Sequence, residues 1–109
     1  MLATPPCPVH VVGKRVVNAS GRTVYTDPDY QAVTHEIRCS GRAVWIMFHG
    51  GAASSQEAYV LVRSADGGRT FHRYAVPALT GYGATLRSDG VSGSTVTISA
   101  KGRTATVHT

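Results

Sequence analysis

The chain has 109 residues, of which 42% are hydrophobic and 16% charged, and its net charge is +5. This length allows one domain with a single core, and the composition excludes a disordered chain. The basic charge is compatible with nucleic acid, an anionic lipid surface or an acidic glycan, but the arginines are spread along the chain and no nucleic-acid motif occurs, which argues against nucleic acid.

The N-terminal segment, residues 1–8, is rich in proline and has no apolar stretch typical of a signal peptide. No stretch of the chain is apolar for long enough to span a membrane. Cys7 and Cys39 allow one disulfide, which suits an oxidising compartment; two buried thiols in a cytosolic protein are the alternative. We expect the bridge, and with it a secreted, periplasmic or cell-surface protein whose residues 9–109 form one domain.

Residues 9–109 read as short strands separated by turn residues, and no segment has the pattern of a helix. Residues 9–17 predict a strand bent at Gly13, and residues 18–21 predict the turn that follows. Further strands are expected at residues 22–26, 32–39, 43–49, 57–63, 71–76, 82–88, 94–100 and 103–108. The sequence therefore predicts an all-β domain of antiparallel strands.

Two of these strands have informative side-chain patterns. Residues 43–49, AVWIMFH, are apolar at successive positions. Because neighbouring side chains of a strand point to opposite faces, this strand must be covered on both faces, and we expect Trp45 to be a core residue and not a platform for sugars. Residues 94–100 instead alternate Thr or Ser with Val and Ile, which predicts one wet face.

The segment SADGGRTF, residues 64–71, joins two of the expected strands. Its glycines reach positive φ without steric cost, and its short polar side chains can bond the backbone of the turn. The segment resembles the Asp-box, or bacterial neuraminidase repeat, whose pattern Ser-x-Asp-x-Gly-x-Thr-aromatic is matched by Ser64, Asp66, Gly68, Thr70 and Phe71.

In that family the Asp-box joins the third and fourth strands of a sialidase-like propeller blade and has a structural role. The resemblance implies one blade over residues 33–77, with the flanks forming parts of neighbouring blades, about two blades in all. Because a closed propeller needs at least four blades, the chain would then be a fragment or a subunit of an oligomer. A stand-alone β-sandwich that contains the same hairpin is the alternative.

Residue types used by sialidases occur in the chain, among them Arg38, Arg63 and Glu36, but none lies in a family motif. We therefore expect no catalytic residues and no cofactor. The five histidines lack the short spacing of metal ligands, so we expect no metal site.

Tyrosines near the expected turns, together with polar neighbours, form the predicted binding set: Tyr25, Asp29, Tyr30, Tyr82 and Arg87. Such residues stack on and hydrogen-bond to a sugar or a protein partner. We expect a non-catalytic binding domain for a glycan or a partner protein, either monomeric or a homo-oligomer. The alternative is a fragment or subunit of a sialidase-like glycoside hydrolase.

Overall fold

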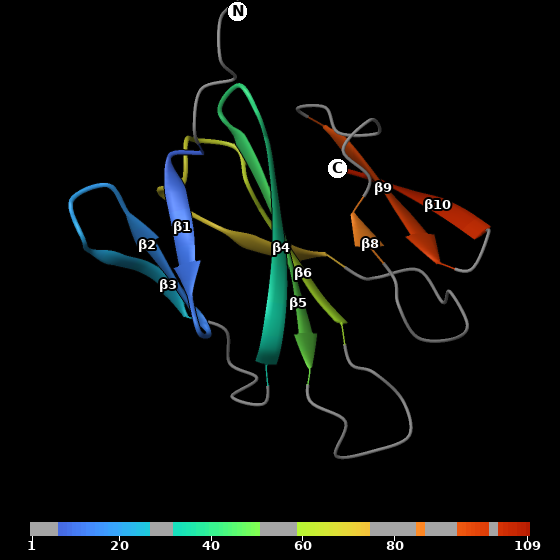
Figure 1. Ribbon diagram of the computed structural model, residues 1–109. Helices are drawn as coiled ribbons and strands as arrows, with labels where there is room; N and C mark the ends of the chain where they lie inside the picture. The colour runs from blue at the N-terminus through green and yellow to red at the C-terminus, as the bar shows by residue number, and fades with distance from the viewer. Residues whose placement is uncertain (1–6, 27–31, 51–58, 75–84, 87–93, 101–102) are drawn as a thin grey trace, which may run out of the picture.

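The computed structural model describes residues 7–26, 32–50, 59–74, 85–86, 94–100 and 103–109, which form strands and no helix (Figure 1). Sheet A contains β1 (Val9–Val12), β2 (Arg15–Asn18) and β3 (Thr23–Thr26). Sheet B contains β4 (Ala32–Ser40), β5 (Ala43–Gly50), β6 (Tyr59–Ser64) and β7 (His72–Tyr74). Sheet C contains β8 (Thr85–Leu86), β9 (Thr95–Ala100) and β10 (Arg103–His108). The expected all-β class is confirmed.

Each sheet is an antiparallel meander of strands that are consecutive in the chain. In Figure 1, sheet A (blue to cyan) and sheet C (orange to red) lie on opposite sides of sheet B (green to yellow). The three sheets therefore follow one another in space in the order of the sequence.

Sheet B is apolar on both faces and forms two cores. On one face, Val44, Ile46 and Phe48 pack with Val9 and Val16 of sheet A. On the other face, the core residues of sheets B and C are Trp45, Met47, Leu61, Leu86, Val96, Ile98 and Val107. Burying each of the larger side chains stabilises the fold by about 1.5–3 kcal/mol. The prediction that β5 is covered on both faces is confirmed, because Trp45 on one face and Ile46 on the other are both 0% exposed.

Sheet A corrects one expectation. Residues 9–17 are not a single bent strand but two strands, β1 and β2, in which Val12 pairs with Arg15. Gly13 has a φ of 63°, the left-handed conformation that a two-residue hairpin requires at its first position. The sequence pattern does not indicate this turn, because valines occur on both sides of Gly13 and Lys14 and the apolar pattern continues across it.

Sheet C has the expected wet face. Val96 and Ile98 are fully buried against sheet B, while Thr97 alternates with them and is only partly covered. On the outer face, the hydroxyl groups of Thr97 and Thr106 lie 3.3 Å apart across the β9–β10 pair. The alternation of residues 94–100 therefore predicted the orientation of this strand.

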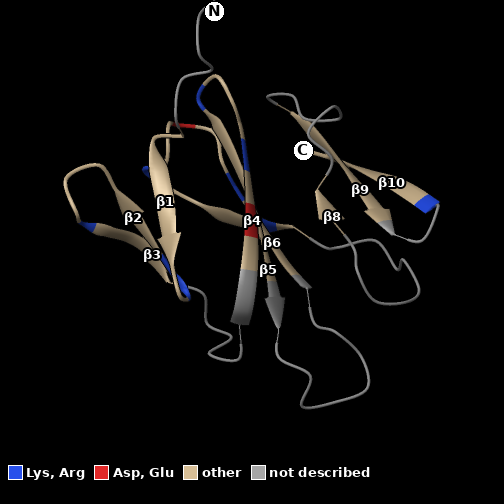
Figure 2. Ribbon diagram, in the orientation of Figure 1, with Lys and Arg blue, Asp and Glu red and all other residues tan. Residues whose placement is uncertain are grey.

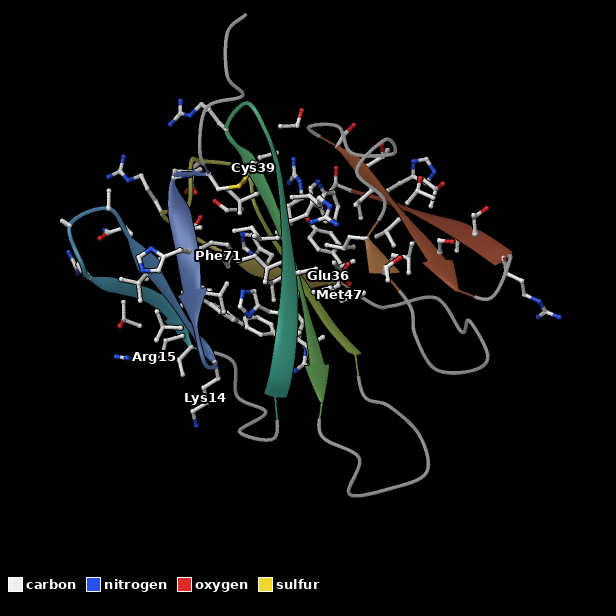
Figure 3. The ribbon with its side chains drawn as sticks, viewed as in Figure 1. Lys14, Arg15, Glu36, Cys39, Met47 and Phe71 are labelled. Atoms are coloured by element: carbon white, nitrogen blue, oxygen red, sulfur yellow. A yellow bond between two sulfur atoms is a disulfide. The ribbon has the colours of Figure 1, made fainter. Side chains whose placement is uncertain are left out.

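A disulfide joins Cys7, which precedes β1, to Cys39 of β4, with the Cα atoms 5.7 Å apart. The predicted bridge is confirmed, and Figure 3 shows it at the end of β4 that leads into the β4–β5 turn. The bridge links sheet A covalently to sheet B near the edge of their shared core.

Candidate functional site

The segment of residues 64–71 forms the β6–β7 hairpin turn, and Asp66 is its centre. The Asp66 carboxylate accepts hydrogen bonds through Oδ1 from the Ser64 hydroxyl (2.7 Å) and from the backbone amides of Arg69 (3.0 Å) and Thr70 (2.9 Å). Its Oδ2 accepts one from the Thr70 hydroxyl (2.6 Å). These hydrogen bonds, led by the Thr70 hydroxyl, hold the pKa of Asp66 well below its usual range. Asp66 therefore remains ionised as an acceptor for the turn.

Ser64 closes the other half of this turn. Its side chain is fully buried, and its hydroxyl accepts a hydrogen bond of 2.8 Å from the backbone amide of Gly68. The Gly67 amide donates to the carbonyl of Arg42, at 2.8 Å, in the β4–β5 turn. Two neighbouring turns of sheet B are thus joined through the backbone.

The same hairpin packs against sheet A. A Cβ atom built on Gly68 would lie 2.6 Å from Val9 Cγ1, so only glycine allows this close approach of the hairpin to β1. The ring of Phe71 lies against that of Tyr25 on β3, with centroids 5.5 Å apart. The β6–β7 hairpin therefore connects sheets A and B through side-chain packing.

The β2–β3 turn lies opposite the hairpin. Asn18 Oδ1 accepts hydrogen bonds from the backbone amides of Ser20 (3.1 Å) and Arg22 (2.9 Å) and from the Ser20 hydroxyl (2.8 Å). All three bonds use the side-chain oxygen. The nitrogen of the same side chain makes no bond to another described residue. Gly21, with a φ of 87°, completes the turn.

A hollow of about 350 Å³ lies between these two turns and is lined by Asn18, Arg22, Thr23, Val24, Gly67, Gly68 and Arg69. Arg22 and Arg69 are exposed, and neither guanidinium group bonds to any other described residue. The Asp66 carboxylate, near Arg69 in the chain, is engaged in the turn. The hollow therefore offers positive charge with unused hydrogen-bond donors, which suits an anionic ligand.

The predicted binding residues have a different distribution. Tyr25 is half-buried on β3, where it contacts Phe71 and packs against the core between sheets A and B. Asp29, Tyr30, Tyr82 and Arg87 lie outside the described residues. The structure instead brings Arg22 and Arg69 together; both follow a glycine in a turn, and that position was the signal available in the sequence.

Two of the arginines considered for a sialidase-like site occupy the opposite face of sheet B. Arg38 and Arg63 are the cross-strand neighbours of Trp45, and the Arg63 guanidinium carbon lies 5.6 Å from the centroid of its ring. Arg38 Nη2 lies 3.7 Å from Glu36 Oε1, which also accepts a hydrogen bond of 3.2 Å from the Leu86 amide. Figure 3 shows Glu36 and Met47 on this side of the sheet. Of these contacts, the hydrogen bond between Glu36 and Leu86 joins sheets B and C, and the others lie within sheet B.

Within the described residues, no group of His, Cys, Asp and Glu could hold a metal ion. No helix suited to crossing a membrane occurs in this part of the chain. No protein-family model matches the sequence, and no curated protein or solved structure gives a significant match.

Proposed function

We propose that the chain is a binding domain without catalysis of its own and that an acidic glycan binds in the hollow between the β2–β3 turn and the β6–β7 hairpin. The observation that carries the proposal is the placement of Arg22 and Arg69, with guanidinium groups not bonded to other described residues, on the same hollow. Arginine binds a carboxylate or sulfate through two parallel hydrogen bonds, which fixes orientation as well as position.

The shape and lining of the hollow favour a sugar over a protein partner. Its volume of about 350 Å³ lies at the lower end of small-molecule sites, which are about 300–1,000 Å³. The Asn18 amide and the Thr23 hydroxyl are suited to sugar hydroxyl groups. A protein partner is usually anchored by large apolar residues in apolar pockets, and Val24 is the only such side chain of this lining.

The test uses isothermal titration calorimetry with oligogalacturonate, an acidic oligosaccharide, and with a neutral oligosaccharide of equal length. We expect the acidic ligand alone to bind, and Arg22→Gln with Arg69→Gln to weaken that binding at least about tenfold by removing two charge-assisted hydrogen bonds. Arg103→Gln on β10 is the control, since it changes charge on an exposed residue of sheet C. Unchanged affinity in the double variant would exclude the hollow as the site.

The alternative, a fragment or subunit of a sialidase-like glycoside hydrolase, has one specific observation in its favour. Three antiparallel meanders pack against one another in chain order, and the segment that resembles the Asp-box joins the third and fourth strands of the central one. Propeller blades have this order and this connection. A solution mass of several chains, together with turnover of a fluorogenic sialoside, would favour this alternative over the binding domain.

The disulfide supports a further part of the proposal, the compartment. Because disulfides form and persist in oxidising surroundings, we infer that the protein is secreted, periplasmic or exposed at a cell surface. Fractionation of the native source with an antibody against the chain tests this inference, and recovery in the cytosolic fraction alone would contradict it.

A further inference from the structure

Three turns near the hollow each carry an exposed arginine: Arg22 in the β2–β3 turn, Arg42 in the β4–β5 turn and Arg69 in the β6–β7 turn. The first and third line the hollow, and the second lies beside it, because Gly67 of the lining donates its amide proton to the carbonyl of Arg42. Figure 2 shows basic residues in blue on each of these turns.

We propose that this row of turns binds a linear polyanionic polysaccharide, with carboxylate or sulfate groups on successive sugars, and that the chain of sugars extends from the hollow onto the β4–β5 turn. This inference rests on the proposed function and adds the class of ligand and the residue that contacts it outside the hollow. We refer to Arg22, Arg42 and Arg69 as the arginine row.

The charge balance supports several anionic contacts instead of one. The described part of the chain contains nine Lys and Arg residues but only two acidic residues, Glu36 and Asp66. Both carboxylates already accept backbone hydrogen bonds. Like Arg22 and Arg69, the Arg42 guanidinium makes no bond to another described residue. The arginine row thus presents, on three turns, three guanidinium groups that no described carboxylate pairs with.

The absence of an aromatic surface in the hollow favours a polysaccharide over a nucleic acid. Proteins that bind single strands stack bases on exposed aromatic rings, and the lining of this hollow contains no aromatic residue. The nearest described rings, Tyr25 and Phe71, are half-buried and tilted against each other. The Thr23 hydroxyl, the side-chain nitrogen of Asn18 and the arginine side chains of the lining remain as ligands for acidic sugars.

The test compares ligand length in the wild-type chain and in Arg42→Gln, Arg22→Gln/Arg69→Gln and Arg103→Gln. The probes are a disaccharide and an octasaccharide of heparin, which carry sulfate, and the corresponding galacturonate oligomers, which carry only carboxylate. We expect Arg42→Gln to weaken the octasaccharide about tenfold and to leave the disaccharide unchanged. Binding with one contact fewer releases fewer counterions, so the slope of log Kd against the logarithm of the salt concentration should fall by about one. The sulfated and carboxylated arms identify which anion is preferred.

The outcomes separate the two proposals. If Arg22→Gln/Arg69→Gln abolishes binding of both lengths while Arg42→Gln changes neither, the hollow is the site and the extension onto the β4–β5 turn is refuted. If no arginine variant differs from Arg103→Gln, the hollow is refuted as well. Equal binding of a single-stranded DNA with the same number of charges, sensitive to the same variants, would show that the arginine row recognises nucleic acid and would overturn the polysaccharide class.

Discussion

One ionised group, the Asp66 carboxylate, accepts most of the side-chain hydrogen bonds that stabilise the β6–β7 hairpin. The Thr70 hydroxyl, the amides of Thr70 and Arg69 and the Ser64 hydroxyl all donate to it. Because these donors favour the charged form, the pKa of Asp66 is lowered in the folded state from its ordinary value of about 3.9. Its stabilising contribution is complete above the ordinary pKa and is lost as the pH falls toward the lower folded pKa.

The matched variant for this prediction is Asp66→Asn, which keeps the shape of the side chain but cannot titrate. At neutral pH we expect it to melt below the wild type, because an amide cannot accept from both the backbone amides and the Thr70 hydroxyl. As the pH falls below about 4, the wild type loses its advantage and the two melting temperatures should converge. Circular dichroism measures both melting temperatures across the acid range. A difference between them that stays constant as the pH falls would show that ionisation of Asp66 does not stabilise the hairpin.

Two adjacent glycines of the hairpin allow the effect of backbone conformation on stability to be distinguished from the effect of packing. Gly67 and Gly68 have φ values of 76° and 91°, so alanine strains the backbone at either position. A Cβ at Gly67 meets open space, whereas one at Gly68 meets Val9. Packing against β1 therefore adds to the backbone requirement for glycine at position 68 but not at position 67.

We therefore expect Gly68→Ala to lower the free energy of unfolding by about 1–3 kcal/mol more than Gly67→Ala does, since only the former overpacks the contact with β1. Denaturant unfolding measures both losses. In a Val9→Ala background, where the clashing methyl group is absent, the difference between the two variants should shrink. Equal losses of unfolding free energy for the two variants in the wild-type background would show that the hairpin is not closely packed against sheet A at Gly68.

At the scale of elements, patterns local in sequence predicted most of the fold. The apolar run of β5 indicated two covered faces, and the turn residues between Ser64 and Phe71 indicated the hairpin. The β1–β2 hairpin was missed because valines surround Gly13. The burial of Tyr25 was not foreseen either, because a bulge between Val16 and Val17 brings both Val24 and Tyr25 onto the core.

The hollow could not be predicted from sequence alone. Arg22 and Arg69 are 47 positions apart, and they meet only because sheet A docks on sheet B through the hairpin. Charge composition showed an excess of arginine but not where the arginines gather. Long-range packing, and not local preference, therefore determines this candidate site.

For the whole molecule, the Cys7–Cys39 bridge closes a loop that contains all of sheet A and spans 32 positions. On the loop-entropy model, replacing both cysteines by serine should lower the free energy of unfolding by about 3–4 kcal/mol. Denaturant unfolding measures this loss, and hydrogen exchange should rise more in sheet A than in sheet C. The control is the intact mass of the wild type after alkylation without reductant, since an oxidised chain adds no label. Equal stability of the wild type and the serine variant would contradict the prediction.

The order of the sheets also has a consequence for biosynthesis. The face of sheet B that contains Trp45, Met47 and Leu61 is covered by sheet C, whose strands follow it in the chain. At a translation rate of ~5–20 residues per second, the ribosome needs about 2–7 s to pass from the end of sheet B at Tyr74 to the end of β10 at His108. During that interval the nascent chain presents an apolar face to water, whereas among the described residues of the finished fold Val12 is the only large hydrophobic side chain left exposed. We therefore expect the chain to be more prone to aggregate during this interval than after sheet C has packed onto sheet B.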